Sequence, residues 1–313
     1  MQATKGAERP RIRIGGYQGG QSVHTKGVEA FRSSLQSALD DCVELVVTPN
    51  VTTSGRRAAD LLEMVAGDEL DICYFSASYL ADRVPSIGLL DLPFEIADRD
   101  QAYAILDGAV GRHLANELQQ ATPYRLLGYW DNGFRNLSNR SHPIAAPGDC
   151  RGLSLRTLDN AFHQEVFRSL GFEPRVIDVR DLVPAVADGS IDAQENPLTN
   201  IVHFDIAAHH PYVTISRHFF GVAALLCNKQ RFAAWPSAVR EAVEAAATQA
   251  TAMQRRLAKQ EDIDCLTALN ERGNQVLTLT EDQRDQFRQA VRPVVERQST
   301  TFPDALLADV RGR

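Results

Sequence analysis

Residues 152–157 read GLSLRT, and the rest of the chain is organised around this stretch. Apolar and polar residues alternate along it, which predicts a β-strand with the leucines and Thr157 on one face and Arg156 on the other. An arginine at the end of such a strand lies at the rim of a sheet, where open α/β sheets bind their ligands. A planar guanidinium can hold a carboxylate through two parallel hydrogen bonds. Arg156 is therefore interpreted as a ligand-binding residue, with a structural ion pair as the alternative.

A second motif lies upstream, where residues 129–137 read YWDNGFRNL. It combines an aromatic pair, a glycine turn and Arg135 within nine positions. Arg135 is a second candidate for contact with an anionic ligand. For Trp130, two roles carry equal weight, as an aromatic wall of a ligand site or as a core residue.

A third motif, QENP at residues 194–197, places Asn196 directly after an expected strand at 191–194. Arg156 and Asn196 both end strands, so we expect their side chains to converge at one edge of a sheet. An asparagine side chain can donate to a carboxylate and accept from a neighbouring hydroxyl. The two side chains could therefore contact one carboxylate together.

Composition restricts the class of protein. The chain has 313 residues, of which 44% are hydrophobic and 23% charged, as in a folded protein of one large or two medium domains. Its net charge of −7 argues against nucleic acid as the main partner. No apolar stretch approaches the ~18 residues that span a bilayer. Residues 1–10 are polar and contain no apolar h-region, so we expect either a cytoplasmic protein or a mature or recombinant form whose secretion signal has been removed.

No cofactor, metal or catalytic site is expected. The chain contains no Walker loop, no G-x-S-x-G elbow and no H-E-x-x-H motif. Its five cysteines form no C-x-x-C pair, which indicates buried free thiols, with one disulfide as the alternative. Histidines are dense between His203 and His218, but His209 and His210 are adjacent, so their side chains diverge. The sequence therefore indicates a binding protein rather than an enzyme.

The first third of the chain reads β-α-β-α-β, which is typical of a parallel sheet with helical crossovers. Expected strands lie at 11–16, 42–48 and 71–75, and apolar spacing predicts a helix at 27–39. Ser54 is expected to cap the next helix. The glycines after the first strand do not match G-x-G-x-x-G, so no dinucleotide site is expected there.

The middle third repeats this order, so the predicted fold is α/β with two similar lobes. A strand at 124–130 precedes the second motif, and a later strand is expected at 175–179. A helix is expected to end at Gly171. Further expectations are one helix at 99–121 and strands at 212–216 and 222–228.

A long helix is predicted from Pro236 to Gly273, where apolar residues recur at spacings of three and four. Such a helix would reach roughly 50 Å, long enough to span both lobes. Thr280 and Gln283 have the spacing of a capping box for a last helix at 281–298.

With these motifs placed, the chain resembles the solute-binding component of tripartite ATP-independent periplasmic (TRAP) transporters, the DctP family. The resemblance extends from the first strand to the last helix and rests on LPF at 92–94, GLSLRT at 152–157 and QENP at 194–197. It implies a two-lobed fold like that of periplasmic binding proteins, which closes on its ligand, with a long helix spanning both lobes.

The resemblance also implies roles for individual residues. The ligand carboxylate would be held by Arg156, with Arg135 and Asn196 assisting. The glycine-rich loop that contains Gln18 and the strand end near Phe75 would face the cleft. An aromatic residue that often contacts the ligand in this family falls at Val179, so stacking is lost at that position.

The expected first lobe comprises residues 11–130 plus about 220–255, and the second 131–219 plus about 256–300, with tails at 1–10 and 301–313. We expect a binder of a small organic acid, a carboxylate or sugar acid, that delivers it to TRAP membrane permease subunits. A ligand-binding sensor and an enzyme on a doubly wound scaffold are the alternatives. A monomer is expected, with a dimer as the alternative.

Overall fold

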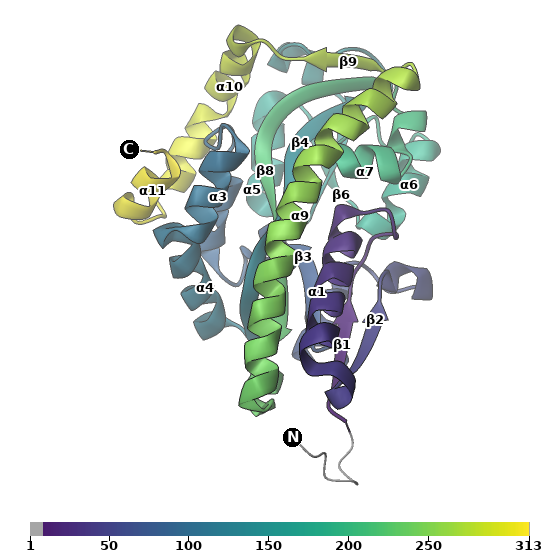
Figure 1. Cartoon of the computed structure of the whole chain (residues 1–313). Helices are drawn as coiled ribbons and strands as arrows, with labels where there is room; N and C mark the ends of the chain where they lie inside the picture. The colour runs from purple at the N-terminus through teal and green to yellow at the C-terminus, as the bar shows by residue number, and fades with distance from the viewer. Residues whose placement is uncertain (1–8, 313) are drawn as a thin grey trace. The chain divides into compact units, whose positions relative to one another are not determined.

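The computed structural model describes residues 9–312 and divides the chain into two compact units (Figure 1). Unit 1 comprises Met1–Phe75, Pro123–Trp130 and Ala224–Arg255. Unit 2 comprises the remainder, Ser76–Thr122, Asp131–Ala223 and Arg256–Arg313. Residues 1–8, most of the expected N-terminal tail, lie outside the described part of the chain.

Unit 2 includes residues 76–122, which the sequence had placed in the first lobe. Residues 76–122 belong to unit 2 partly because the C-terminal segment, which was expected to be a tail, packs against them. It forms helix α11 (Asp304–Val310), and Phe302 and Val310 are buried. The side chain of Gln101, in helix α3 (Arg99–Asp107), donates to the Val310 carbonyl at 2.9 Å. The expectation of a tail at 301–313 is therefore wrong.

Unit 1 confirms the β-α-β-α-β order. Its elements are β1 (Arg11–Gly15), α1 (Val23–Leu39), β2 (Glu44–Thr48), α2 (Asp60–Ala66) and β3 (Ile72–Ser76). β1 lies between β2 and β3 and pairs with both in parallel. The Ser22 side chain caps α1 by accepting from the His24 amide at 3.1 Å. Ser54 does not cap α2, because it ends a separate 3-10 turn and Ala59 precedes the helix.

Two strands are much longer than predicted, and each contributes residues to both units. β4 runs from Tyr124 to Asn139 over 16 residues, and β8 runs from Tyr212 to Asn228 over 17. Gly133 does not turn the chain, although its φ of +86° is the left-handed conformation that glycine adopts readily. β4 continues through it, and its neighbour Phe134 packs edge-on against Phe220 of β8 at 5.1 Å. The glycine turn expected there is therefore wrong.

Unit 2 holds the remaining strands, in the order β8-β4-β7-β5-β6, with β9 on β8. These are β5 (Ser154–Thr157), β6 (Glu173–Val176), β7 (Ala193–Pro197) and β9 (Gln275–Thr278). β7 is antiparallel to β4 and parallel to β5. The expected strand at 175–179 ends at Val176, because the Asp178 side chain caps α6 (Val179–Ala187).

The helices follow the sequence signals closely. α5 (Ala161–Leu170) ends at Gly171, whose φ is +100°, as predicted. α9 (Ser237–Glu271) is the expected long helix, with 35 residues. α10 (Glu281–Ser299) begins with the predicted capping box. The expected helix at 99–121 is interrupted at Gly108, which separates α3 from α4 (Ala109–Ala121).

Two further observations concern the whole described chain. All five cysteines are free thiols, of which Cys42 is exposed and the other four are buried. The expectation of buried free thiols is confirmed for four cysteines and wrong for Cys42, and the single disulfide is not formed. None of the described helices combines the length and the apolar character needed to cross a membrane.

Candidate ligand-binding site

Arg156 lies in β5, between β7 and the edge strand β6 of the unit 2 sheet. The residue is only 2% exposed, and its Nε donates to the Ile177 carbonyl at 2.8 Å. No described acidic side chain forms an ion pair with it, so the structural ion pair that was the alternative for Arg156 is not seen. Its register partner on β6 is Arg175, which is exposed and approaches Glu173 at 3.6 Å. The sheet therefore buries one of two neighbouring arginines without a carboxylate.

Arg135 is held differently. It lies in β4, and its Nη2 donates to the Glu195 carboxylate at 2.7 Å and to the Glu195 carbonyl at 2.9 Å. Its Nε donates to the other carboxylate oxygen. The two residues are 5% and 0% exposed, respectively. The register of β4 on β7 allows this contact. It sets Arg135 opposite Pro197 and Leu137 opposite Glu195, so Arg135 and Glu195 are diagonal neighbours across the two strands.

Glu195 is ionised within this site. Burial by itself would raise the pKa of its carboxyl group, but the charge of Arg135, with hydrogen bonds from Arg135 and His218, holds it far below its usual range. The Nε2 atom of His218 lies 3.4 Å from the carboxylate. Burial lowers the pKa of His218, against the opposing effect of Glu195. At neutral pH, therefore, the Arg135–Glu195 pair has no net charge and His218 is neutral.

Asn196 lies beside this pair in a chain of amide side chains. Its Nδ2 donates to Gln194 at 2.6 Å, and its Oδ1 accepts from Asn200 at 3.0 Å. Gln194 in turn donates to the Ser138 hydroxyl at 2.6 Å. The amide of Asn196 is thus held in one orientation by its neighbours, and its contact with a ligand stays a prediction.

Tyr79 is a residue of this region that sequence reasoning missed. Burial raises the pKa of its phenol, which also lies in the field of four charged groups, Arg156, Asp178, Arg135 and Glu195. Two of these charges are positive and two are negative. Tyr79 follows β3 by only three residues, so its place after a strand end was the available signal. Glu195 was likewise part of the QENP motif but was given no role.

The other predicted site residues belong to unit 1. Gln18 is 1% exposed, and its side-chain oxygen accepts from the Ser22 hydroxyl. Phe75, at the end of β3, is 1% exposed and packs edge-on against Tyr17 at 5.3 Å. Both side chains therefore take part in the packing of the loop that follows β1. Ligand contact by Gln18 and Phe75 stays a prediction.

Trp130 is fully buried within unit 1. Its ring stacks on Tyr74 at 5.7 Å, and its indole N–H donates to Thr251 of α9 at 3.2 Å. A Cβ on Gly27 of α1 would approach this ring to 3.1 Å. These contacts favour the core role among the two expected for Trp130. Its role as a wall of the ligand site stays a prediction.

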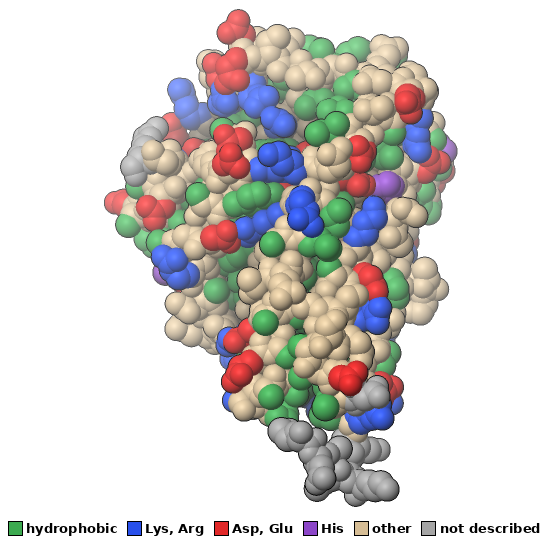
Figure 2. Space-filling model, in the orientation of Figure 1, with side chains coloured by type: hydrophobic (Ala, Val, Ile, Leu, Met, Phe, Trp, Pro, Cys, Tyr) green, Lys and Arg blue, Asp and Glu red, His purple; other side chains and the backbone are tan. Residues whose placement is uncertain are grey.

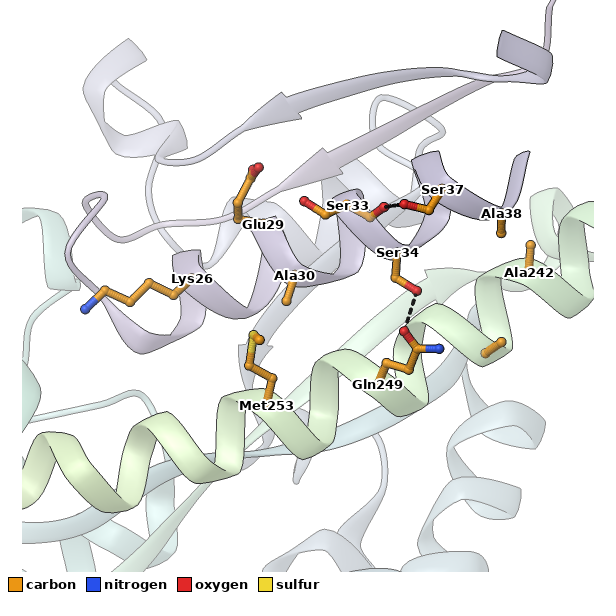
Figure 3. Close-up of a pocket in the computed structure, with 11 residues that line it drawn as sticks. Lys26, Glu29, Ala30, Ser33, Ser34, Ser37, Ala38, Ala242, Gln249 and Met253 are labelled. Atoms are coloured by element: carbon orange, nitrogen blue, oxygen red, sulfur yellow. Dashed lines mark hydrogen bonds between the residues drawn. The ribbon is translucent and has the colours of Figure 1, made fainter. Parts of the chain in front are cut away.

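A groove of about 710 Å³ lies between α1 and α9 in unit 1 (Figure 3). Small side chains such as Ser33, Ala38 and Ala242 line it, and Ser34 donates to Gln249 across it at 2.9 Å. None of the six predicted site residues lines this groove. It is therefore separate from the candidate site.

Comparison with known proteins gives a consistent result. Residues 14–301 match the model of bacterial extracellular solute-binding protein, family 7. A solute-binding protein of Verminephrobacter eiseniae is 28% identical over 241 residues, 77% of this chain and 71% of that protein. The sugar acid binding protein of Advenella mimigardefordensis in complex with galactonate is 26% identical, with a TM-score of 0.92 and 97% of each chain covered. A TRAP periplasmic solute binding protein of Sulfurospirillum deleyianum with bound succinate is 25% identical, with a TM-score of 0.91, 97% of this chain and 99% of that one covered.

Proposed function

Because the chain belongs to family 7 of the bacterial extracellular solute-binding proteins, we propose that it binds a small organic acid in the periplasm and delivers it to the membrane subunits of a TRAP transporter. As the resemblance implies, its two lobes would close on the ligand. Members of this family are solute-binding proteins rather than enzymes, and no cofactor is proposed.

One observation carries the proposal, namely that Arg156 is buried, donates to a backbone carbonyl and forms no direct ion pair with an acidic side chain of residues 9–312. A buried charge without a counter-charge costs several kcal/mol. A ligand carboxylate would supply that counter-charge and two parallel hydrogen bonds. The burial of Arg156 would therefore increase affinity for an anion, because binding removes an existing penalty. Asn196 would complete the contact through its amide.

The charges around Tyr79 narrow the ligand class to acids with one carboxylate. Arg135 is neutralised by Glu195, so Arg156 is the remaining cation of this group, and Asp178 adds a negative charge. A monocarboxylate would already leave the group with net charge −1. A second ligand carboxylate near Tyr79 would meet Asp178 and Glu195 without a free cation. Hydroxyl groups suit the remaining amides, so a sugar acid or hydroxy acid fits better than a dicarboxylate.

The proposal is tested with matched pairs of acids that share a carbon skeleton and differ by one carboxylate. Suitable pairs are galactonate with galactarate and 4-hydroxybutanoate with succinate. Isothermal titration should show tighter binding of at least one monocarboxylate, and the ligand should be recovered chemically unchanged. Turnover of the ligand would support an enzyme instead. Failure of every acid to bind would refute the organic-acid function, whereas tighter binding of the dicarboxylates would refute only the ligand class.

A further inference from the structure

Three side chains of unit 2, outside the candidate ligand site, bring a nitrogen, an oxygen and a sulfur together. His203 is the last residue of α7 (Leu198–His203), and Glu261 and Cys265 lie on α9. One ligand atom from each lies within 4.8 Å of the other two. Glu261 and Cys265 are four residues apart, so they share one face of their helix. Two packed helices therefore support the cluster, which holds its donors more rigidly than a loop would.

We propose that His203, Glu261 and Cys265 bind one Zn²⁺ ion. Imidazole, carboxylate and thiolate are the three donor types that zinc accepts in proteins. The thiolate excludes Mg²⁺ and Ca²⁺, which prefer oxygen donors alone. A site with three protein ligands leaves the fourth tetrahedral position to water.

Charge and exposure suit such an ion. With Cys265 as thiolate and Glu261 as carboxylate, two negative charges balance the charge of Zn²⁺, so the complex is neutral and can be half-buried. Cys265 is 2% exposed, whereas the side chains of Glu261 and His203 are 12% and 32% exposed. Access is therefore from the histidine side. Figure 2 shows that acidic and basic side chains are interspersed over the face of the molecule in view.

Two existing interactions must change when the ion binds. His203 Nε2 contacts the Glu261 carboxylate directly, so the pair must separate to admit the metal. Metal binding must also displace the proton of the Cys265 thiol, because the thiolate is the ligand.

The chain contains a matched control for the histidine and carboxylate. On α4, His113 lies 3.2 Å from Glu117 with the same atoms paired, and their side chains are 38% and 37% exposed. Among the described residues, no sulfur ligand joins that pair. Cys42 is exposed and could bind metal by itself, so it is replaced by serine in every protein that is tested.

The experiment uses the full chain with Cys42→Ser, stripped of metal and titrated with Zn²⁺ by calorimetry and with Co²⁺ by absorbance. We expect one ion per chain, release of a thiol proton and a sulfur-to-cobalt charge-transfer band. Cys265→Ala should abolish that band, and His203→Gln and Cys265→Ala should each weaken Zn²⁺ binding at least about 100-fold. His113→Gln should change nothing.

His203→Gln keeps the test decisive if Cys265→Ala disturbs the core, because the His203 side chain is partly exposed. Binding that persists in both variants would show an adventitious surface site and overturn the proposal. So would the absence of a stoichiometric Zn²⁺ ion in the Cys42→Ser protein. A cobalt complex without the charge-transfer band would show that Cys265 is not a ligand, which also overturns it.

Discussion

Arg135 and Glu195 form a buried ion pair, with Nη2 of the arginine 2.7 Å from Oε1 of the glutamate. The pair joins neighbouring strands of unit 2 and is further contacted by Thr157, whose hydroxyl lies 3.3 Å from the carboxylate. As a result, Arg135 and Arg156 differ in how their charges are compensated, although each stands in a similar strand motif in the sequence. The charge of Arg135 is compensated by a directly paired carboxylate, whereas Arg156 forms no ion pair with any of the described residues.

Arg156→Ala should abolish organic-acid binding while leaving the fold intact, because the counter-charge for the ligand is lost. Arg156→Lys should also weaken binding by at least about tenfold, since a point charge cannot make the paired contact. Isothermal titration measures both effects. Arg175→Ala, at the exposed register partner, is the control and should bind normally. An unchanged dissociation constant in Arg156→Ala would place the carboxylate elsewhere.

Glu195→Gln should reduce the free energy of unfolding by about 3 kcal/mol, because it leaves Arg135 buried without its counter-charge. Arg135→Met should have a similar effect. The double variant should lose less than the sum of the two, with a coupling energy above about 1 kcal/mol. Urea denaturation of the four proteins gives this cycle. Additive losses would mean that the two side chains contribute independently.

Glu195→Gln should also change ligand preference. This substitution removes the negative charge that neutralises Arg135. The arginine could then attract a second carboxylate of the ligand. The ratio of dissociation constants for galactarate and galactonate should fall relative to the native protein. Glu173→Gln, in the exposed pair with Arg175, should leave the ratio unchanged. A ratio unaffected by Glu195→Gln would contradict the role assigned to this charge.

His24 should make the protein sensitive to mild acid. Burial lowers its pKa from 6.5 to about 3 in the folded protein, where its ring stacks on Tyr74 at 5.1 Å. The unfolded chain gains a proton below pH 6.5 that the folded chain does not, so stability present above that pH is lost progressively as the pH falls towards 3.

Between pH 7 and pH 5 this loss amounts to about 2 kcal/mol. His24→Phe keeps an aromatic ring against Tyr74 and removes the titrating group, so its free energy of unfolding should fall by that much less over the same interval. His210, whose pKa burial lowers to about 4, remains in both proteins and contributes equally. Identical pH profiles would show that His24 is solvated in the folded state.

Gly16→Ala should destabilise unit 1 by about 1–3 kcal/mol, as overpacking does. A Cβ at Gly16 would lie 2.6 Å from the Pro49 carbonyl oxygen and 2.6 Å from the Tyr74 ring, and the backbone oxygen cannot move aside cheaply. Gly19, in the same loop, has no atom within 4 Å of such a Cβ. Gly19→Ala should therefore remain within about 0.5 kcal/mol of the native protein in thermal unfolding. Equal melting temperatures for both variants would show that the loop adapts.

Local patterns were sufficient for much of the fold. The end of α5 at Gly171 and the capping box at Thr280 and Gln283 depend on residues within one or two turns of a helix, so sequence spacing reveals them. The β-α-β-α-β order of unit 1 follows in the same way from short apolar periods. Strand lengths were harder, because β4 continues through Gly133, where the residue type suggested a turn.

The ion pair between Arg135 and Glu195 could not be predicted from any local sequence pattern. Arg135 and Arg156 each stood in a strand motif, and the sequence offered no means to tell which would keep an uncompensated charge. The distinction depends on Glu195, which is 60 residues from Arg135 and reaches it only through the register of β4 on β7. Local residue types place the arginines on strands, whereas the register of distant strands determines which of the two has a carboxylate within reach.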